Sequence, residues 1–236
     1  MSAVPLIAIR PEPGCSATVA TAEALGLTAR GFPLFEIEPR AWHAPERIEF
    51  DALLIGSANA LRHAGPELER YSGLPTYVVG EVTAGACRAA GFEVVAVGSG
   101  GLQEVLGRVE TRHRRLLRLA GEERIALDPP PGITLIERVV YVSRPLPMPT
   151  GLTELLSAPA VVLLHSAAAA RHFAAECARQ GVARANVALA AIGPRVAAAA
   201  GGGWREVATA SQTGDSALLA LAREMCQTLG RRDRQP

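Results

Sequence analysis

The sequence comprises 236 residues, of which 49% are hydrophobic and 20% are charged, enough for one large domain or two small ones. Its formal net charge of +1 gives no overall attraction to nucleic acid or to an anionic membrane. All 24 basic residues are arginines, and the absence of lysine from the sequence excludes a Schiff-base lysine, a pyridoxal-phosphate lysine and the lysine of a P-loop. Only 4% of the residues are aromatic, which leaves few side chains to stack on bases or flat cofactors.

The apolar runs are short, and proline, glycine or arginine interrupts each of them before membrane-spanning length. The first 14 residues do not resemble a signal peptide. The four cysteines form no C-x-x-C pair, which predicts buried thiols rather than disulfides or a metal site; they are Cys15, Cys87, Cys177 and Cys226. We therefore expect a cytoplasmic protein that binds neither nucleic acid nor membrane.

Apolar runs typical of buried strands alternate with alanine-rich segments typical of helices. In chain order, strands are predicted at 5–9, 51–56, 76–80, 93–97, 124–128, 160–165 and 188–193. Helices are predicted between them at 58–70, 83–90, 102–119, 167–180 and 195–200. Because the strand runs are continuously apolar, both faces of each strand should be covered, as in a parallel sheet. The alternation predicts an α/β fold with parallel sheets flanked by helices.

The chain also contains an internal repeat with an offset of roughly one hundred residues, which indicates two related domains. "DALLIGSANALRH" (51–63) matches "AVVLLHSAAAARHF" (160–173), so that Ser57 corresponds to Ser166. Residues 76–95 match 188–207 in the same way. "IRPEPG" at 9–14 resembles "LDPPPG" at 127–132, and each is predicted to precede a helix.

Two segments, 32–39 and 139–145, alternate apolar and polar residues and end at a proline, which suits strands that cross between domains. The run 108–124 is rich in arginine. It is interpreted as a solvated helix face, with contact to an anion as the alternative.

Four loops combine a strand end with the start of a helix, the position where open α/β sheets bind ligands. They are "GSAN" (56–59), "GEVTA" (80–84), "HSAA" (165–168) and "GPRVA" (193–197). A Ser or Thr there caps the helix, and the free N–H groups beyond it attract anions. For a single loop plain capping is sufficient, but the duplicated set predicts anion binding by helix N-termini.

The pair His165–Ser166 invites comparison with a hydrolase nucleophile, but the G-x-S-x-G pattern is absent around both Ser57 and Ser166. The repeat has Gly56 where the second copy has His165, so the histidine is not a property of both halves. The five histidines are scattered and none shows the H-E-x-x-H spacing of a zinc site. We therefore expect no metal site.

Taken in order, several segments resemble the uroporphyrinogen-III synthase family over nearly the whole chain, from Ile7 to about Leu221. They are "IAIRP", "DALLIGSANALR", "VVGEVTAGACRAAG", "LAGEERIALDPPPG", "RVVYVSRP", "AVVLLHSAAAARHF" and "AAIGPRVAAAA". The resemblance implies two similar α/β domains, each a parallel sheet flanked by helices, joined by a two-stranded linker. The first domain would comprise 1–36 plus 147–236, the second 40–143, and the linker strands about 34–39 and 139–146.

The resemblance further implies an enzyme of tetrapyrrole (haem) biosynthesis that acts as a monomer without cofactor or metal. Its substrate would be hydroxymethylbilane, a linear tetrapyrrole with eight carboxylates. The family removes the ring A hydroxyl, inverts ring D and closes the macrocycle to uroporphyrinogen III.

Residue by residue, the resemblance assigns Tyr141 to a linker tyrosine that would assist loss of the hydroxyl as a hydrogen-bond donor; a purely packing role is the alternative. Thr83 matches a threonine of the substrate site, and Ser57 and Ser166 match paired loop serines. Arg10 would bind a propionate, with a surface ion pair as the alternative. The substrate-binding residues predicted in full are Arg10, Ser57, Ala58, Asn59, Gly80, Thr83, Ser166, Ala167, Gly193 and Arg195.

The sequence departs from the family at Gly56 and His165, where threonine is common, and at Arg195 and Val196 in the last loop. Arg195 is therefore predicted to hold a carboxylate instead. A hypothesis from another class stays open: a non-catalytic two-domain protein that binds a small polyanion.

Overall fold

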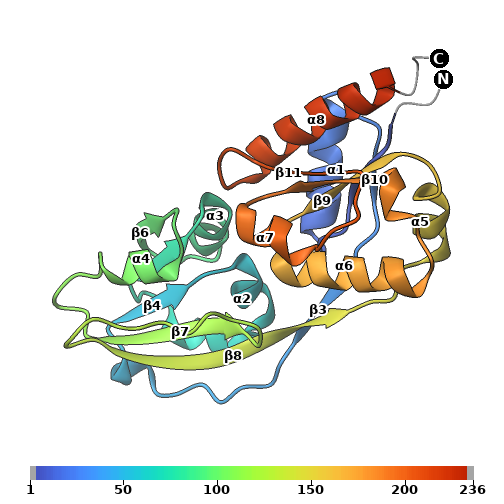
Figure 1. Cartoon of the computed structure of the whole chain (residues 1–236). Coiled ribbons are helices and arrows are strands. Elements are labelled where there is room, and N and C mark those ends of the chain that lie inside the picture. Colours follow the sequence, from blue (N-terminus) through green and yellow to red (C-terminus); the bar gives the residue numbers. More distant parts are fainter. Residues whose placement is uncertain (1–3, 233–236) are drawn as a thin grey trace. The chain divides into compact units, whose positions relative to one another are not determined.

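The computed structural model describes residues 4–232 and divides the chain into two compact units (Figure 1). Unit 1 comprises Met1–Glu36 and Pro145–Pro236, of which residues 1–3 and 233–236 lie outside the described residues. Unit 2 comprises Ile37–Arg144. Each unit is built on a largely parallel sheet flanked by helices, as the apolar runs predict.

The sheet of unit 1 has five parallel strands in the order β11-β10-β9-β1-β2. The strands are β1 (Leu6–Ala8), β2 (Ala29–Gly31), β9 (Ala160–Leu164), β10 (Val187–Ala191) and β11 (Glu206–Thr209). The central strand β9 explains the continuous apolar pattern: Val161 and Val162 point to opposite faces, and both are fully buried in separate hydrophobic clusters.

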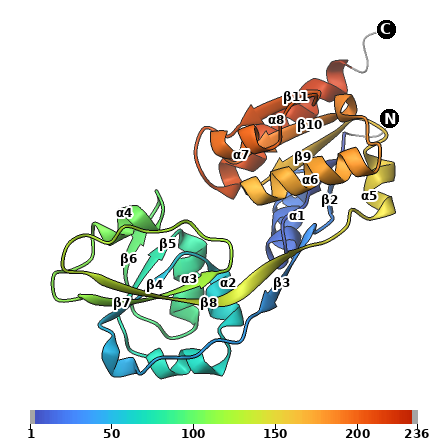
Figure 2. The ribbon, with the colours of Figure 1, turned by 60° about the horizontal axis from the view of Figure 1, so that its bottom comes forward.

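Helices cover both faces of this sheet (Figure 2). On one face lie α1 (Gly14–Ala24) and α8 (Asp215–Arg232). On the other lie α5 (Thr150–Leu155), α6 (Ala167–Arg179) and α7 (Pro194–Ala199), with the short 3-10 turn η3 (Arg184–Asn186) before β10.

The sheet of unit 2 has the order β3-β8-β7-β4-β5-β6. The strands are β3 (Phe35–Pro39), β4 (Ala52–Ile55), β5 (Thr76–Val79), β6 (Val94–Gly98), β7 (Arg115–Gly121) and β8 (Thr134–Pro145). One face carries α2 (Ala58–His63), α3 (Glu81–Ala89) and the 3-10 turn η2 (Pro66–Tyr71), while η1 (Arg47–Glu49) precedes β4. The other face carries α4 (Leu102–Leu106) and apolar residues of the loop 122–133.

Strands β3 and β8 connect the two units and lie side by side (Figures 1 and 2). They run antiparallel: the N–H of Arg40 donates to the carbonyl of Val140 at one end, and the N–H of Leu146 donates to that of Leu34 at the other. Pro39 and Pro145 are the last residues of the two strands, as the sequence indicates, and the two hydrogen bonds come from the residues that follow them.

The exit of β8 into unit 1 is fastened to one face of α6. His172 bonds the carbonyl of Leu146 through Nε2 at 2.7 Å, Glu176 accepts the N–H of Met148 at 2.6 Å, and Gln180 donates to the carbonyl of Met148 at 2.7 Å. These three side chains follow each other at intervals of four residues, the spacing of one helix face. Arg179 pairs with Glu176 through two hydrogen bonds and holds the pKa of Glu176 at about 2.

The predicted helix at 102–119 is wrong. Helix α4 ends at Leu106, and the arginine-rich run contains the central strand β7. Its interpretation as a solvated helix face is also wrong, because the Arg118 residue is only 4% exposed. The arginines at the start of the run hide the apolar pattern of β7, in which every residue after Arg115 is buried.

The predicted strand at 124–128 is wrong as well, since these residues form a loop. "LDPPPG" at 127–132 precedes the strand β8 and not a helix. Consecutive prolines cannot donate backbone hydrogen bonds, so the segment packs over the sheet as irregular chain. Arg118 fastens this loop by donating to the carbonyl of Ile125 at 3.0 Å, and it also pairs with Glu137 on the neighbouring strand β8.

The predicted helix at 58–70 is divided into α2 and η2, because Gly65 has a positive φ of 70° and Pro66 follows it. The remaining predicted strands and helices are found with shifts of a few residues at most. Strand β8 begins five residues before the predicted start. Besides β7, the sequence prediction lacks β2, β11, α5, α8 and the short turns η1 and η3. All four cysteines are buried free thiols, as predicted.

Candidate functional sites at two switch points

Each sheet contains one point where neighbouring strands lead in opposite directions, which is where open α/β sheets bind ligands. In unit 1 this point lies between β1, which leads to β2, and β9, which leads to β10. In unit 2 it lies between β4, which leads to β5, and β7, which leads to β8. The residues at these strand ends form the two candidate sites.

In unit 1, Arg10 follows β1, and Ser166 follows β9 as the N-cap of α6. The Ser166 hydroxyl accepts the N–H of Ala169 at 3.1 Å, and Ala167 is the first residue of the helix. Ser166 is therefore a helix cap in its geometry and has no features of a nucleophile.

The Arg10 guanidinium contacts a carboxylate from the other end of the chain. Its NH1 group donates to Oδ2 of Asp215, the first residue of α8, at 2.7 Å. The Thr18 hydroxyl of α1 lies 3.4 Å from the same oxygen. The proximity of His165, followed by the charge of Arg10, holds the pKa of Asp215 below its usual range against the opposing effect of burial.

His165 is also largely buried, with 9% of its side chain exposed. Its Nε2 lies 3.3 Å from Oδ1 of Asp215, but the angle does not suit a hydrogen bond. Within residues 4–231 neither ring nitrogen has a hydrogen-bond partner. Burial lowers the pKa of His165, and Asp215 only partly offsets this, so the imidazole is neutral at neutral pH.

The last loop of unit 1 places Gly193 at the N-cap of α7 in an extended conformation. Arg195 in the first turn of α7 is exposed, and no hydrogen bond or ion pair joins it to the described residues. This guanidinium is available to an anion in solution.

In unit 2, Ser57 caps α2 by accepting the N–H of Asn59 at 3.2 Å. Ala58 is buried in the first turn of the helix. The Asn59 side chain accepts a hydrogen bond from Arg62 at 3.0 Å. The repeat predicted from the sequence thus places two serine caps at equivalent strand ends.

The next loop of unit 2 has Gly80 at the N-cap of α3 with a φ of 78°, a conformation that favours glycine. Thr83 in the first turn is only 6% exposed, so little of its side chain is open to a ligand.

Tyr141 lies beside the switch point of unit 2, because β8 neighbours β7 and pairs it with Gly121. A Cβ atom on Gly121 would come within 2.6 Å of the Tyr141 ring and 2.9 Å of its hydroxyl, so only glycine leaves room for the phenol. The His63 ring lies 6.3 Å from the Tyr141 ring. In the described part of the chain the Tyr141 hydroxyl has no hydrogen-bond partner, which leaves it free to donate to a ligand.

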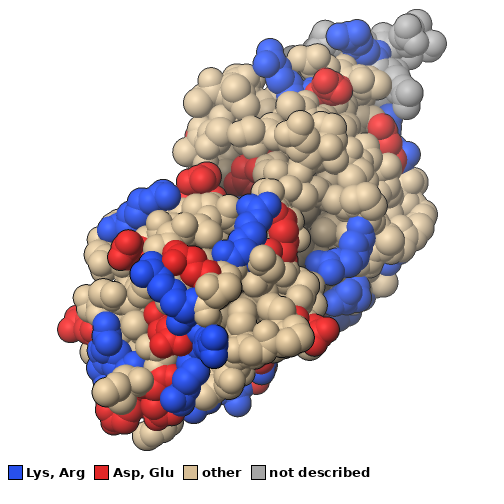
Figure 3. Space-filling model, turned by 90° about the vertical axis from the view of Figure 1, so that its left-hand side faces the viewer, with Lys and Arg blue, Asp and Glu red and all other residues tan. Residues whose placement is uncertain are grey.

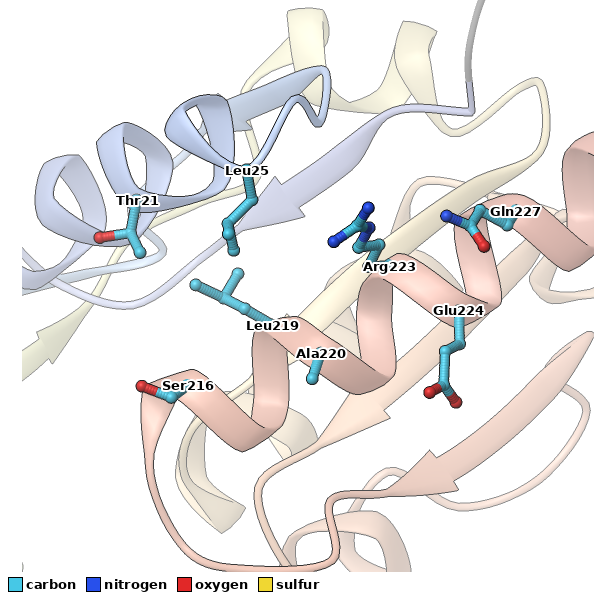
Figure 4. A pocket seen from close by; sticks show the side chains of 8 residues that line it. All are labelled: Thr21, Leu25, Ser216, Leu219, Ala220, Arg223, Glu224 and Gln227. Carbon is cyan, nitrogen blue, oxygen red and sulfur yellow. The ribbon is translucent and has the colours of Figure 1, made fainter.

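A separate groove of about 570 Å³ lies between α1 and α8 in unit 1 (Figure 4). None of the predicted site residues lines it; its walls are Thr21, Leu25, Ser216, Leu219, Ala220, Arg223, Glu224 and Gln227. Over much of the face drawn in Figure 3, arginines and carboxylates are interspersed. Among the described residues no helix has the length and apolarity of a membrane span, and no three His, Cys, Asp or Glu side chains converge as metal ligands would.

Sequence reasoning missed three residues of these sites. Asp215 lies roughly two hundred residues from Arg10, although "GDSALL" at 214–219 is a helix start with an acid in the first turn. Gly14 and Gly121 matter through the side chains that approach them, and no sequence pattern announces such an approach.

The fold and sites define a class: a duplicated α/β protein with serine helix caps at both switch points, a partly exposed arginine at that of unit 1 and a free phenol at that of unit 2. The sequence profile described as "Uroporphyrinogen-III synthase HemD" matches residues 16–220. The chain therefore belongs to the uroporphyrinogen-III synthase family, and it is a cyclising lyase of tetrapyrrole biosynthesis.

Solved structures give the same fold at low sequence identity. The uroporphyrinogen-III synthetase of Helicobacter pylori is 17% identical with a TM-score of 0.62, and the match covers 94% of this chain and 99% of that one. A mutant uroporphyrinogen III synthase of Thermus thermophilus is 19% identical with a TM-score of 0.55, covering 95% of this chain and 100% of that one. A comparison of the sequence with curated proteins finds no match.

Proposed function

We propose that this chain cyclises hydroxymethylbilane to uroporphyrinogen III, with loss of the ring A hydroxyl and inversion of ring D, as a cytoplasmic monomer. The assignment of the substrate site rests on a difference between the two switch points. Unit 1 has Arg10 and a capped helix start, whereas unit 2 has the phenol of Tyr141, which lies against Gly121. A substrate with eight carboxylates and one departing hydroxyl needs both kinds of group.

The carboxylates would be bound by N–H groups of the capped helix starts and by arginine. In unit 1 these are the loop of Ser166 and Ala167, the loop of Gly193 and Arg195, and Arg10. In unit 2 they are the loop of Ser57, Ala58 and Asn59 and the loop of Gly80 and Thr83. Backbone N–H groups and single guanidinium groups hold carboxylates by charge-assisted hydrogen bonds. This accounts for polyanion binding by a chain whose net charge is only +1.

Tyr141 would donate a hydrogen bond to the ring A hydroxyl as it leaves. The rest of the rate enhancement would come from orientation, because binding that keeps rings A and D close converts ring closure into a favourable intramolecular step. No cofactor or metal takes part in this scheme.

Isomer analysis of the product tests the function. Hydroxymethylbilane cyclises without help to the type I isomer, so purified protein and fresh substrate are mixed, quenched, oxidised and separated by chromatography. We expect the type III isomer in excess over a protein-free control. A product that is only type I, together with retained binding of uroporphyrin measured by fluorescence quenching, would instead support the non-catalytic polyanion-binding protein.

A further inference from the structure

The contact between Arg10 and Asp215 uses only one part of the guanidinium. NH1 donates to Oδ2 of Asp215 at 2.7 Å and lies 3.4 Å from the Thr18 hydroxyl. Among the described residues, no hydrogen bond occupies Nε or NH2 of Arg10. These two nitrogens form one edge of the guanidinium, and that edge is the fork that binds a carboxylate through two parallel hydrogen bonds.

Gly14, the first residue of α1, lets the face of this guanidinium lie against the helix start. A Cβ atom at residue 14 would lie 2.6 Å from Nε, 2.9 Å from Cζ and 3.1 Å from NH2 of Arg10. Any larger residue would therefore push the guanidinium away from the position in which NH1 meets Asp215. The nearby carboxylate of Glu12 does not compete for it, because Glu12 accepts the N–H and the hydroxyl of Ser16 at 3.0 and 2.8 Å.

His165 shows that this cluster is more than a surface ion pair. Exposed ion pairs contribute little to stability, and both partners here are partly exposed. The imidazole beside them, however, is buried at the end of β9 without a hydrogen-bond partner among residues 4–231. Burying such a group unpaired costs free energy, and a buried polar atom without a partner calls for an explanation, of which a bound ligand or water is one.

We propose that Asp215 is a positioning residue that holds Arg10 by NH1, with the guanidinium lying against Gly14, and so directs its Nε/NH2 edge toward one substrate carboxylate. This inference rests on the proposed function, because it assigns one carboxylate subsite of that reaction to unit 1. Asp215 itself does not contact the substrate in this arrangement; it fixes the direction of the group that does.

Two substitutions test the subsite by opposite means. Asp215→Ala releases the guanidinium, whereas Gly14→Ala displaces it by placing a Cβ atom against its face. We expect each to raise KM for hydroxymethylbilane, and Kd for uroporphyrin, about tenfold with kcat within twofold of the unaltered protein. Asp215→Asn retains a side-chain oxygen that accepts a hydrogen bond from NH1 of Arg10, so this variant should keep most of the affinity that Asp215→Ala loses.

The background of Arg10→Ala decides whether the effect passes through Arg10. There, Asp215→Ala and Gly14→Ala should change KM less than twofold further. Persistence of the full tenfold effect in that background, or an unchanged KM in both single variants, would overturn the proposal. If Asp215→Ala does not fold, Gly14→Ala still decides, since alanine is a better helix former than glycine.

Matched controls are Glu46→Ala, which removes a carboxylate from the exposed pair with Arg70, and Gly230→Ala, where a Cβ has ordinary contacts only. Neither should alter KM. A failure of the proposed function would appear differently, as formation of type I product alone by the unaltered protein.

Discussion

The two units share a strand order but differ in what stands at the switch point. Reading unit 1 as β11-β10-β9-β1-β2 and unit 2 as β6-β5-β4-β7-β8 gives the same arrangement, with serine caps after β9 and β4. Unit 1 has Arg10, His165 and Asp215 at this point, whereas unit 2 has Gly121 and Tyr141. Duplication has kept the sheet and the helix starts, while the side chains beside them have diverged.

One equivalent pair of residues shows how the divergence is accommodated. His165 of unit 1 corresponds to Gly56 of unit 2 in the repeat. A Cβ at Gly56 would come within 2.8 Å of the Leu102 side chain, so an apolar residue fills the space next to it. The position that carries a polar side chain at the end of β9 is thus packed against an apolar side chain at the end of β4.

The largest effect is expected where unit 2 replaces a helix with a loop. In unit 1, α1 and α8 cover a face of the sheet, whereas in unit 2 α4 and the loop 122–133 do so, with buried Arg118 as the fastener. Arg118→Ala leaves the carbonyl of Ile125 without its donor and leaves Glu137 with the partly exposed Arg124 as its partner. It should lower the free energy of unfolding by about 3 kcal/mol in urea titrations. Arg70→Ala, in an exposed pair, should lower it by less than about 1 kcal/mol. Equal losses would show that the loop does not depend on Arg118.

Tyr141→Phe tests the phenol that distinguishes unit 2. Loss of the hydrogen-bond donor should lower kcat for type III formation about 100-fold, with little change in KM, because the donor acts on the departing hydroxyl. Steady-state kinetics with isomer analysis measures this. Tyr71→Phe is the matched control, since that hydroxyl bonds the carbonyl of Pro45 at 2.7 Å in the core; its kcat should be unchanged. An unaltered kcat in Tyr141→Phe would limit Tyr141 to packing.

Glu176→Gln tests the contact that holds the end of β8 on α6. Helix α6 of unit 1 is longer than its equivalent in unit 2, the short helix α2. The pKa of Glu176 is about 2, lowered first by hydrogen bonding to Arg179. A carboxylate with a lowered pKa in the folded state stabilises it at pH values above the unfolded-state pKa, near 4.3. That stabilisation disappears as pH falls toward 2.

The glutamine variant should therefore be less stable by about 1.5 kcal/mol at pH 7. Its difference from the unaltered protein should shrink between pH 4.3 and 2, as followed by urea unfolding at several pH values. A difference independent of pH over that window would assign the stabilisation to shape rather than charge.

The sequence predicted the elements whose patterns are local. Continuous apolar runs identified β4, β5, β9 and β10, since both faces of these strands are buried. It failed for β7, because arginines within the run obscure the pattern and Arg118 is buried by pairing with Glu137, which lies on the neighbouring strand. The sequence also wrongly predicts a strand and a helix start in the proline-rich loop 122–133. The conformation of this loop depends on the sheet beneath it, which a local pattern does not record.

By itself the sequence determined the parallel α/β class, the duplication, the serine caps and the family, all of which follow from patterns within short segments or from their order. The tertiary structure alone decided which groups meet: Asp215 with Arg10 from opposite ends of the chain, and Tyr141 with Gly121 on neighbouring strands. Strand order determines these meetings, and strand order results from the burial of whole sheet faces, which no short segment records.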